Sequence, residues 1–311
     1  MTQVLHRLLR TAILSAADSA PIRVWITRNG MRLGASRFVA GESEDDFIAA
    51  AAAENRSGFA VTAGILGEDT RDQKSALEAT AGYLSLLAQI RQHCVDSTVA
   101  LKTTHLGLNV DPQLAFDNVK SVAAAAQSLD NFMRLDMEQS FHVDETLNIY
   151  TALRRSGFDN VGFVLQAYLY RSMSDLEALL PLGTDLRIVK GAYLEPPSVA
   201  YQNKRDVDAN FMRLMARSLR DGKYTAIATH DPAILHAAMR ITEERGVSPK
   251  RFEFQMLYGI SSRLAQTLRD RGYRVRLAIP FGSYWFPYLM RRLAERPANL
   301  SFFFRNALAP A

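Results

Sequence analysis

Short runs of apolar and β-branched residues recur along the chain from about residue 58 onwards. Between them, apolar residues return every three or four positions, as in residues 175–180 and 211–219, which is the spacing of an amphipathic helix. The runs predict eight strands, at residues 58–66, 98–104, 131–137, 161–167, 185–192, 224–230, 251–257 and 273–280. Because strands that alternate with helices form parallel sheets, and eight of them favour closure, the predicted fold class is α/β, a (βα)8 TIM-type barrel.

The residues at helix starts support this division of the chain. Asp111-Pro112 and Asp231-Pro232 each combine an aspartate cap with proline at the first helical position, a favoured way to begin a helix. Residues 42–46 open an alanine-rich helix with acidic side chains at its positive end. The first 55 residues look helical, with a turn signal at 28–30. We therefore expect an N-terminal helical extension over residues 1–55 and a catalytic barrel over residues 56–311.

Composition and charge narrow the class of protein. The 311 residues are 48% apolar and 22% charged, as in soluble globular proteins. A net charge of +5 would suit nucleic acid or an anionic membrane, but the basic residues are spread along the chain, so no nucleic-acid partner is expected. The densest cluster, at residues 263–276, reads as a solvated helix face and the start of a strand. No apolar run reaches the length needed to span a membrane.

Cysteine and histidine usage argues against a metal site. Cys94 is the only cysteine, which excludes an internal disulfide and any multi-cysteine metal site and fits a reducing compartment, the cytoplasm. Cys94 ends a helical pattern, so an inert thiol is favoured over a reactive one. The histidines show no paired metal spacing, and no metal is expected. The first 20 residues superficially resemble a transit peptide, but an ordinary amphipathic helix is favoured.

Polar residues gather where the predicted strands end, which is where (βα)8 barrels carry their chemistry. A single polar residue there is usually solvated or satisfied, but a buried charge is costly unless it is paired or binds a ligand. Six of the eight strands carry one, which predicts a ligand site at this mouth of the barrel. No G-x-G-x-x-G sequence occurs, so a dinucleotide would be held by barrel loops. The residues are Lys102, Asp136, Gln166, Arg187 or Lys190, His230 and Gln255.

The last predicted helix carries the most specific group of residues. Tyr288, Arg292 and Glu295 share one helical face, and Arg291 lies beside it. Two adjacent arginines suit a carboxylate ligand. The alternative is a surface helix that carries an ordinary ion pair.

Five segments together resemble the proline dehydrogenase family: FVLQAYLYRS (163–172), RIVKGAYLEP (187–196), TAIATHDP (225–232), FEFQMLYGI (252–260) and IPFGSYWFPYLMRRLAERPANLSF (279–302). The likeness extends from about residue 58 to 304, and RIVKGAY combined with Y-L-x-R-R-x-x-E is its specific part. It implies a monofunctional, FAD-containing barrel that oxidises L-proline to Δ1-pyrroline-5-carboxylate, the first step of proline catabolism to glutamate. It also implies electron transfer to a quinone, with peripheral association at the inner face of the cell membrane.

The resemblance further implies roles for individual residues. Arg291, Arg292 and Lys102 would bind the carboxylate of proline. Asp136, which orients Lys102, and Arg187, which approaches the flavin N5, would be the catalytic residues. The ring of the substrate would contact Tyr288, Ile188, Tyr193 and Leu257. The cofactor would be held by Met137, Gln166, Arg187, Val189, Lys190, Gly191, Ala192, Thr229, His230 and Glu295.

The resemblance also implies a gate at the mouth of the barrel, and the sequence departs from the family at one position of the expected pocket. Glu68 resembles a gate acid that pairs with Arg291 across the closed mouth of the barrel; the plainer alternative is that Glu68 caps the following helix with Asp69. Ala278 stands where the family often has tyrosine, which opens space at the pocket wall.

Two other functions remain alternatives at this point. One is a different flavin- or phosphate-binding barrel that acts on another small acid, and the specific motifs count against it. The other is a basic barrel without enzyme activity that binds nucleic acid or lipid. No stripe of interleaved aromatic and basic residues supports it. The oligomeric state is left open.

Overall fold

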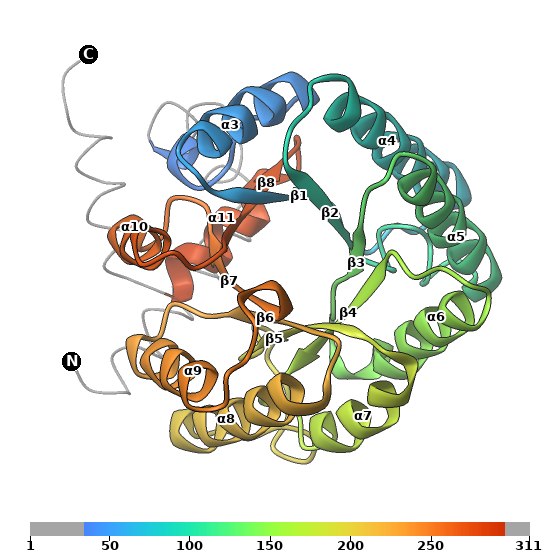
Figure 1. Ribbon diagram of the computed structural model, residues 1–311. Helices are drawn as coiled ribbons and strands as arrows, with labels where there is room; N and C mark the ends of the chain where they lie inside the picture. Colours follow the sequence, from blue (N-terminus) through green and yellow to red (C-terminus); the bar gives the residue numbers. More distant parts are fainter. Residues whose placement is uncertain (1–33, 296–311) are drawn as a thin grey trace.

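The computed structural model describes residues 34–295, with side chains up to Met290, and it contains a closed barrel of eight parallel strands (Figure 1). The strands pair in chain order and β8 pairs with β1. The predicted fold class is confirmed, and every predicted strand overlaps an observed one. The strands are β1 Ala60–Ile65, β2 Ser97–Leu101, β3 Met133–Leu135, β4 Val161–Gln166, β5 Asp185–Val189, β6 Tyr224–Ala228, β7 Phe252–Leu257 and β8 Val275–Phe281.

Helices surround this barrel as an outer ring (Figure 1). Both Asp-Pro predictions are confirmed: the Asp111 carboxylate accepts from Gln113 N at 2.7 Å, and the Asp231 carboxylate accepts from Ala233 N at 3.1 Å. The α-helices are α3 Glu44–Arg56, α4 Gln73–Gln92, α5 Pro112–Ser128, α6 Val143–Arg155, α7 Ser172–Leu179, α8 Lys204–Asp221, α9 Pro232–Glu244, α10 Ser262–Asp270 and α11 Trp285–Glu295. The 3-10 helices are η1 Ala35–Arg37, η2 Ser140–His142, η3 Leu180–Leu182 and η4 Pro249–Arg251.

Helix α3 belongs to the helical ring of the barrel. Ser43 and Asp46 form a capping box at its start. Phe47 stacks on Phe281 of β8, with ring centroids 5.0 Å apart. The predicted boundary at residues 55 and 56 therefore falls at the end of a helix that covers the barrel wall. Residues 1–33, which include the segment compared with a transit peptide, lie outside the described part of the chain.

Side chains alternate between the two faces of each strand, and this alternation separates apolar from polar residues. The apolar core lies between the sheet and its helices and includes Val61, Phe163 and Phe254. Polar side chains such as Arg187 and Arg276 line cavities inside the barrel instead. Within residues 34–295, no helix is long and apolar enough to cross a membrane.

Candidate active site

A cavity of about 190 Å³ lies at the carboxyl-end mouth of the barrel. Strands β1, β2, β5, β7 and β8 and their loops contribute to its wall, as parallel strands that end at one mouth must do. The structure therefore brings together side chains that the sequence placed at separate strand ends. The predicted residues that line it are Glu68, Lys102, Asp136, Arg187, Leu257 and Tyr288.

Arg187 and Asp136 form an ion pair across the inside of the barrel. Arg187 Nη1 donates to Asp136 Oδ1 at 2.6 Å, and the two side chains are 10% and 32% exposed. Burial lowers the pKa of Arg187 to about 10, and the negative charge of Asp136 opposes that effect. Arg187 therefore remains a cation at neutral pH, held in one position beside the cavity.

Lys102 pairs with Glu68 rather than with the expected Asp136. Glu68 follows β1 and Lys102 follows β2, and these two strands are neighbours in the sheet. Asp136 follows β3 and reaches Arg187 on β5 instead. The structure therefore does not show the predicted contact between Asp136 and Lys102. The barrel places a different carboxylate beside each cation: Glu68 beside Lys102, and Asp136 beside Arg187.

The predicted gate between Glu68 and Arg291 remains a prediction. Helix α11 carries Arg291, Arg292 and Glu295, whose side chains lie outside the described residues. The alternative, that Glu68 and Asp69 cap the next helix, is wrong. Helix α4 is capped by Asp72, whose carboxylate accepts from Ser75 N at 2.9 Å.

The loop that carries Glu68 is fixed by contacts that the sequence did not reveal. A Cβ atom on Gly67 would lie 2.1 Å from Nε2 of His105, so the loop fits this ring only because residue 67 is glycine. Asp69 N donates to Thr104 Oγ1 at 3.2 Å. Thr104 in turn donates to buried Glu138, from N at 3.1 Å and from Oγ1 at 2.6 Å. The spacing of Asp136 and Glu138 by two residues at one strand end was the available signal for Glu138.

Burial adjusts the ionisation of both supporting side chains. It raises the pKa of Glu138, although the Thr104 hydroxyl opposes the change. Burial, together with the charge of Lys102, lowers the pKa of His105 to about 4. His105 is therefore neutral at physiological pH and adds no further cation beside the Lys102–Glu68 pair.

Two buried polar atoms, one on Arg187 in the cavity wall and one on Gln166 at the end of β4, point to a polar ligand. Gln166 Nε2 reaches Met137 O at 3.5 Å, but Gln166 Oε1 has no partner within the described part of the chain. Arg187 Nε is also buried, and the contacts described for residues 34–295 leave it unpaired. Unsatisfied buried groups are costly and therefore uncommon. A ligand with both a donor and an acceptor, such as a flavin ring, fits these two atoms.

The segment after β5 packs closely against the residues that follow β4. Gly191 has a φ of +113°, and a Cβ there would lie 2.3 Å from the ring of Tyr168. Backbone hydrogen bonds join this segment to the end of β4: Ala167 N donates to Val189 O at 2.8 Å, and Tyr168 N to Lys190 O at 2.9 Å. Ala192 is exposed and Tyr193 is half-buried.

Lys190, one of the predicted cofactor ligands, is held by two carboxylates. Its Nζ donates to Asp208 at 2.5 Å and to Asp231 at 2.7 Å. Burial would raise the pKa of Asp231, but hydrogen bonds from Lys190 and Lys204 lower it overall. Lys190 therefore sits in a fixed position at the same mouth of the barrel.

Thr229 and His230 also make defined contacts after β6. The Thr229 hydroxyl accepts from Asp231 N at 3.1 Å. His230 Nε2 accepts from Leu257 N at 3.1 Å, which requires an unprotonated Nε2. Through this bond His230 positions Leu257, a residue of the cavity wall.

Two positions concern the expected substrate pocket. Ile188 does not line the cavity, contrary to the prediction, and is fully buried in the apolar core. The reason is strand alternation: Arg187 faces the cavity, so Ile188 points to the other side of the sheet. Ala278 does line the cavity, as expected for a position where a small residue opens the wall.

Comparisons with known proteins point to a single family. A family profile described as proline dehydrogenase matches residues 47–305. The chain is 37% identical to proline dehydrogenase 1 of Bacillus subtilis subsp. natto over 301 residues, covering 97% of this chain and 99% of that protein. It is 38% identical to a proline dehydrogenase of Deinococcus radiodurans, covering 98% and 99% of the two chains. A solved structure of proline utilization A from Bdellovibrio bacteriovorus superposes with a TM-score of 0.81 at 27% identity, covering 92% of this chain and 35% of that chain.

Proposed function

The chain belongs to the proline dehydrogenase family, an oxidoreductase family acting on proline, and from this premise we propose that it oxidises L-proline to Δ1-pyrroline-5-carboxylate with FAD as cofactor. The observation that carries the cofactor proposal is the pair of buried, unsatisfied atoms Gln166 Oε1 and Arg187 Nε in the part of the chain that the structure describes. FAD, when bound, supplies the acceptor for the hydride that leaves C5 of proline. This oxidation is the first step of proline catabolism to glutamate.

The residues proposed to hold FAD surround the mouth of the barrel. Gln166 and Arg187 provide the two unsatisfied atoms, and Gly191 lets the backbone of residues 189–192 pack against the ring of Tyr168. Lys190 and His230 are already fixed by protein contacts and need little reorganisation on binding. The full proposed set is Met137, Gln166, Arg187, Val189, Lys190, Gly191, Ala192, Thr229, His230 and Glu295.

Proline is proposed to bind with its carboxylate toward the cations of the site. Lys102 contributes one cation to the cavity wall, and Arg291 and Arg292 of α11 are the proposed partners. Leu257, Tyr288 and Tyr193 would contact the ring. Binding the carboxylate at one end determines which ring carbon is presented for oxidation.

Charge also prepares the substrate amine. The oxidation removes a hydride from C5 and a proton from nitrogen, so the reacting amine must be neutral. In the cavity wall Lys102 and Arg187 are each paired with a carboxylate, Glu68 and Asp136, so the excess positive charge that favours the unprotonated amine would come from Arg291 and Arg292. We assign no dedicated base.

Anaerobic titration with proline tests the redox proposal. The purified protein should show a flavin spectrum that bleaches when proline is added and returns when a quinone is added. Gln166→Ala should lose FAD, because it removes the buried acceptor, whereas the exposed Gln127→Ala on α5 should keep it. A Gln166→Ala protein with full flavin content and normal turnover would place the cofactor elsewhere.

Methionine substitutions test carboxylate recognition. Arg291→Met or Arg292→Met should raise the KM for proline about ten- to hundredfold while FAD stays bound, because each loses a charge-assisted hydrogen bond of about 1.5–3 kcal/mol. Steady-state kinetics with parallel flavin quantitation measures this. An unchanged KM in both variants would contradict the assignment.

A double-mutant cycle tests the gate. Glu68→Ala should slow flavin reduction by proline, with a smaller effect in an Arg291→Ala background if the two side chains act together. Fully additive losses would show that they do not. A second cycle, with Glu68→Ala and Lys102→Ala, serves as the comparison. Coupling between these two substitutions is expected, because the two side chains form an ion pair in the structure.

Cellular location and the acceptor follow from the same family premise. We propose a cytoplasmic protein that reaches a quinone by peripheral association at the inner face of the cell membrane. Co-sedimentation with vesicles that contain the quinone, with and without proline, tests this. Protein that stays in the supernatant under both conditions would refute the membrane part.

A further inference from the structure

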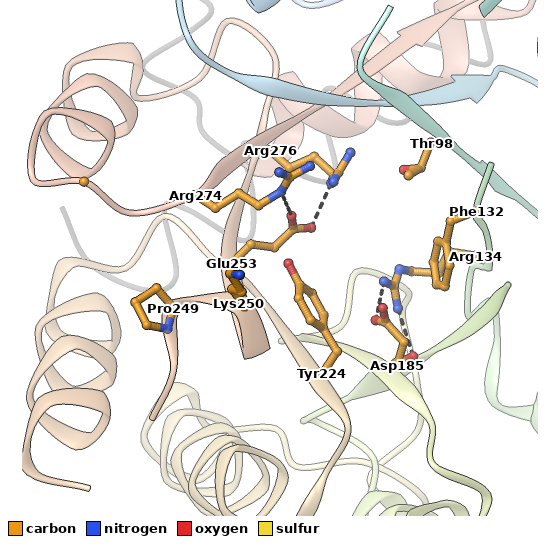
Figure 2. A pocket seen from close by; sticks show the side chains of 11 residues that line it. Thr98, Phe132, Arg134, Asp185, Tyr224, Pro249, Lys250, Glu253, Arg274 and Arg276 are labelled. Carbon is orange, nitrogen blue, oxygen red and sulfur yellow. Dashed lines mark hydrogen bonds and ion pairs between the residues drawn. The ribbon is translucent and has the colours of Figure 1, made fainter. Parts of the chain in front are cut away.

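A second cavity, of about 460 Å³, lies inside the barrel at the opposite mouth, where the strands begin (Figure 2). Thr98, Arg134, Asp185 and Tyr224 contribute to its wall from near the starts of β2, β3, β5 and β6. Its size is typical of small-molecule sites, which range from about 300 to 1,000 Å³. None of the residues proposed for proline or FAD lines it.

Positive charge is in excess around this cavity. Four cationic side chains and two carboxylates line it. Both carboxylates are engaged already: Glu253 accepts from Arg276 Nε at 2.8 Å and from Arg274 Nε at 3.2 Å, and Asp185 accepts from Arg134 Nη2 at 2.6 Å. Asp96, outside the lining, approaches Arg274 at 3.3 Å. Even with Asp96 included, cations outnumber carboxylates by one.

Hydrogen-bond donors remain available to a ligand. Arg276 uses Nε on Glu253 and Nη1 on Val61 O at 2.6 Å, and the contacts described for residues 34–295 leave its Nη2 unused. The same contacts leave Lys250 Nζ, at the rim, without a partner. Figure 2 shows the arginines and Tyr224 arranged around one open space. Burial and the charge of Glu253 raise the pKa of Tyr224, so its hydroxyl keeps its proton.

The buried pair at the floor holds these cations in place. Glu253 and Arg276 are only 2% and 8% exposed at their side chains. Burial alone would raise the pKa of Glu253, but Arg276 lowers it to about 2, so the carboxylate stays charged. The carboxylates around the cavity do not neutralise all the cations of its lining. Phe132, whose ring packs 5.1 Å from the Arg134 guanidinium, adds an aromatic surface.

We propose that this cavity binds a small dianion that carries a phosphate group. Arg276, Arg274 and Lys250 would contact the phosphate, and Phe132 and Tyr224 would face any organic part. Arginine forks and lysine are well suited to phosphate oxygens. The inference is independent of the proposed function, since it uses residues at the other mouth of the barrel.

Calorimetric titration of the full-length, flavin-loaded protein tests the site with two probes, inorganic phosphate and phenyl phosphate. Lys250→Gln and Arg274→Gln should each raise the Kd about tenfold, because each removes a charge-assisted contact. Lys74→Gln is the matched control: it removes the same charge from an 85%-exposed side chain at the start of α4, at the other mouth. Its Kd should equal that of the unmodified protein.

The two probes identify the class of ligand. Tighter binding of phenyl phosphate supports an organic phosphate, and equal binding supports the free anion in the same site. No heat of binding with either probe, or an equal loss in all three variants, would overturn the proposal. Urea unfolding of each variant shows that a lost signal does not come from an unfolded protein.

Discussion

Asp136→Ala removes the carboxylate that holds Arg187 inside the barrel. The bond of 2.6 Å joins a guanidinium that is 10% exposed to a carboxylate that is 32% exposed. Breaking a fully buried pair costs about 3–5 kcal/mol, but water at Asp136 screens part of this, so we expect a loss of about 2 kcal/mol in the free energy of unfolding. Asp136→Asn retains an acceptor oxygen and should lose about half as much.

Urea unfolding of the flavin-free protein measures this loss by linear extrapolation. Asp117→Ala is the matched control, since among residues 34–295 the carboxylate of this exposed aspartate on α5 accepts only from Gln113 Nε2, at 3.1 Å. It should change stability by less than about 0.5 kcal/mol. In the cycle with Arg187→Met, Asp136 and Arg187 should show a coupling of about 2 kcal/mol.

Activity provides the second readout of the same variant. Without Asp136, Arg187 is no longer held at the cavity, so turnover with proline should fall while FAD remains bound through its other contacts. Additive stability losses in the cycle, together with unchanged turnover of Asp136→Ala, would refute the reasoning. The ion pair would then contribute nothing to stability, and Arg187 would not depend on Asp136 for its role in turnover.

Two further predictions concern packing and pH. Gly67→Ala should destabilise the protein by about 1–3 kcal/mol, because its Cβ would lie 2.1 Å from His105. Gly64→Ala is the control: its Cβ meets no atom within 4 Å, so the melting temperature should stay unchanged. Equal melting temperatures for the two variants would contradict this prediction. Glu253 has a pKa lowered from 4.5 to about 2, so its stabilisation is complete above pH 4.5 and is lost as the pH falls toward 2. Between pH 4.5 and pH 2 the free energy of unfolding should fall by about 3 kcal/mol more in the unmodified protein than in Glu253→Gln. Urea unfolding at a series of pH values measures this, and profiles that run parallel for the two proteins would exclude the effect.

The sequence alone determined the elements and the mouth at which the proposed chemistry lies. Short β-rich runs separated by helical patterns predicted all eight strands, and local chemistry at Asp111 and Asp231 predicted two helix starts. These features depend on residues close together in the chain, so a linear reading can detect them. The polar strand ends likewise predicted the mouth that contains Lys102, Asp136 and Arg187.

The tertiary structure decided which of these side chains meet. The arrangement of the strands in the closed barrel pairs Glu68 with Lys102 and Asp136 with Arg187, whereas the sequence had suggested other partners. The same closure brought Glu253 and Arg276 together at the opposite mouth, although Arg276 had read as part of a solvated cluster. Pairing between strands depends on residues far apart in the chain, and the pattern of any one strand fixes only which face a side chain takes.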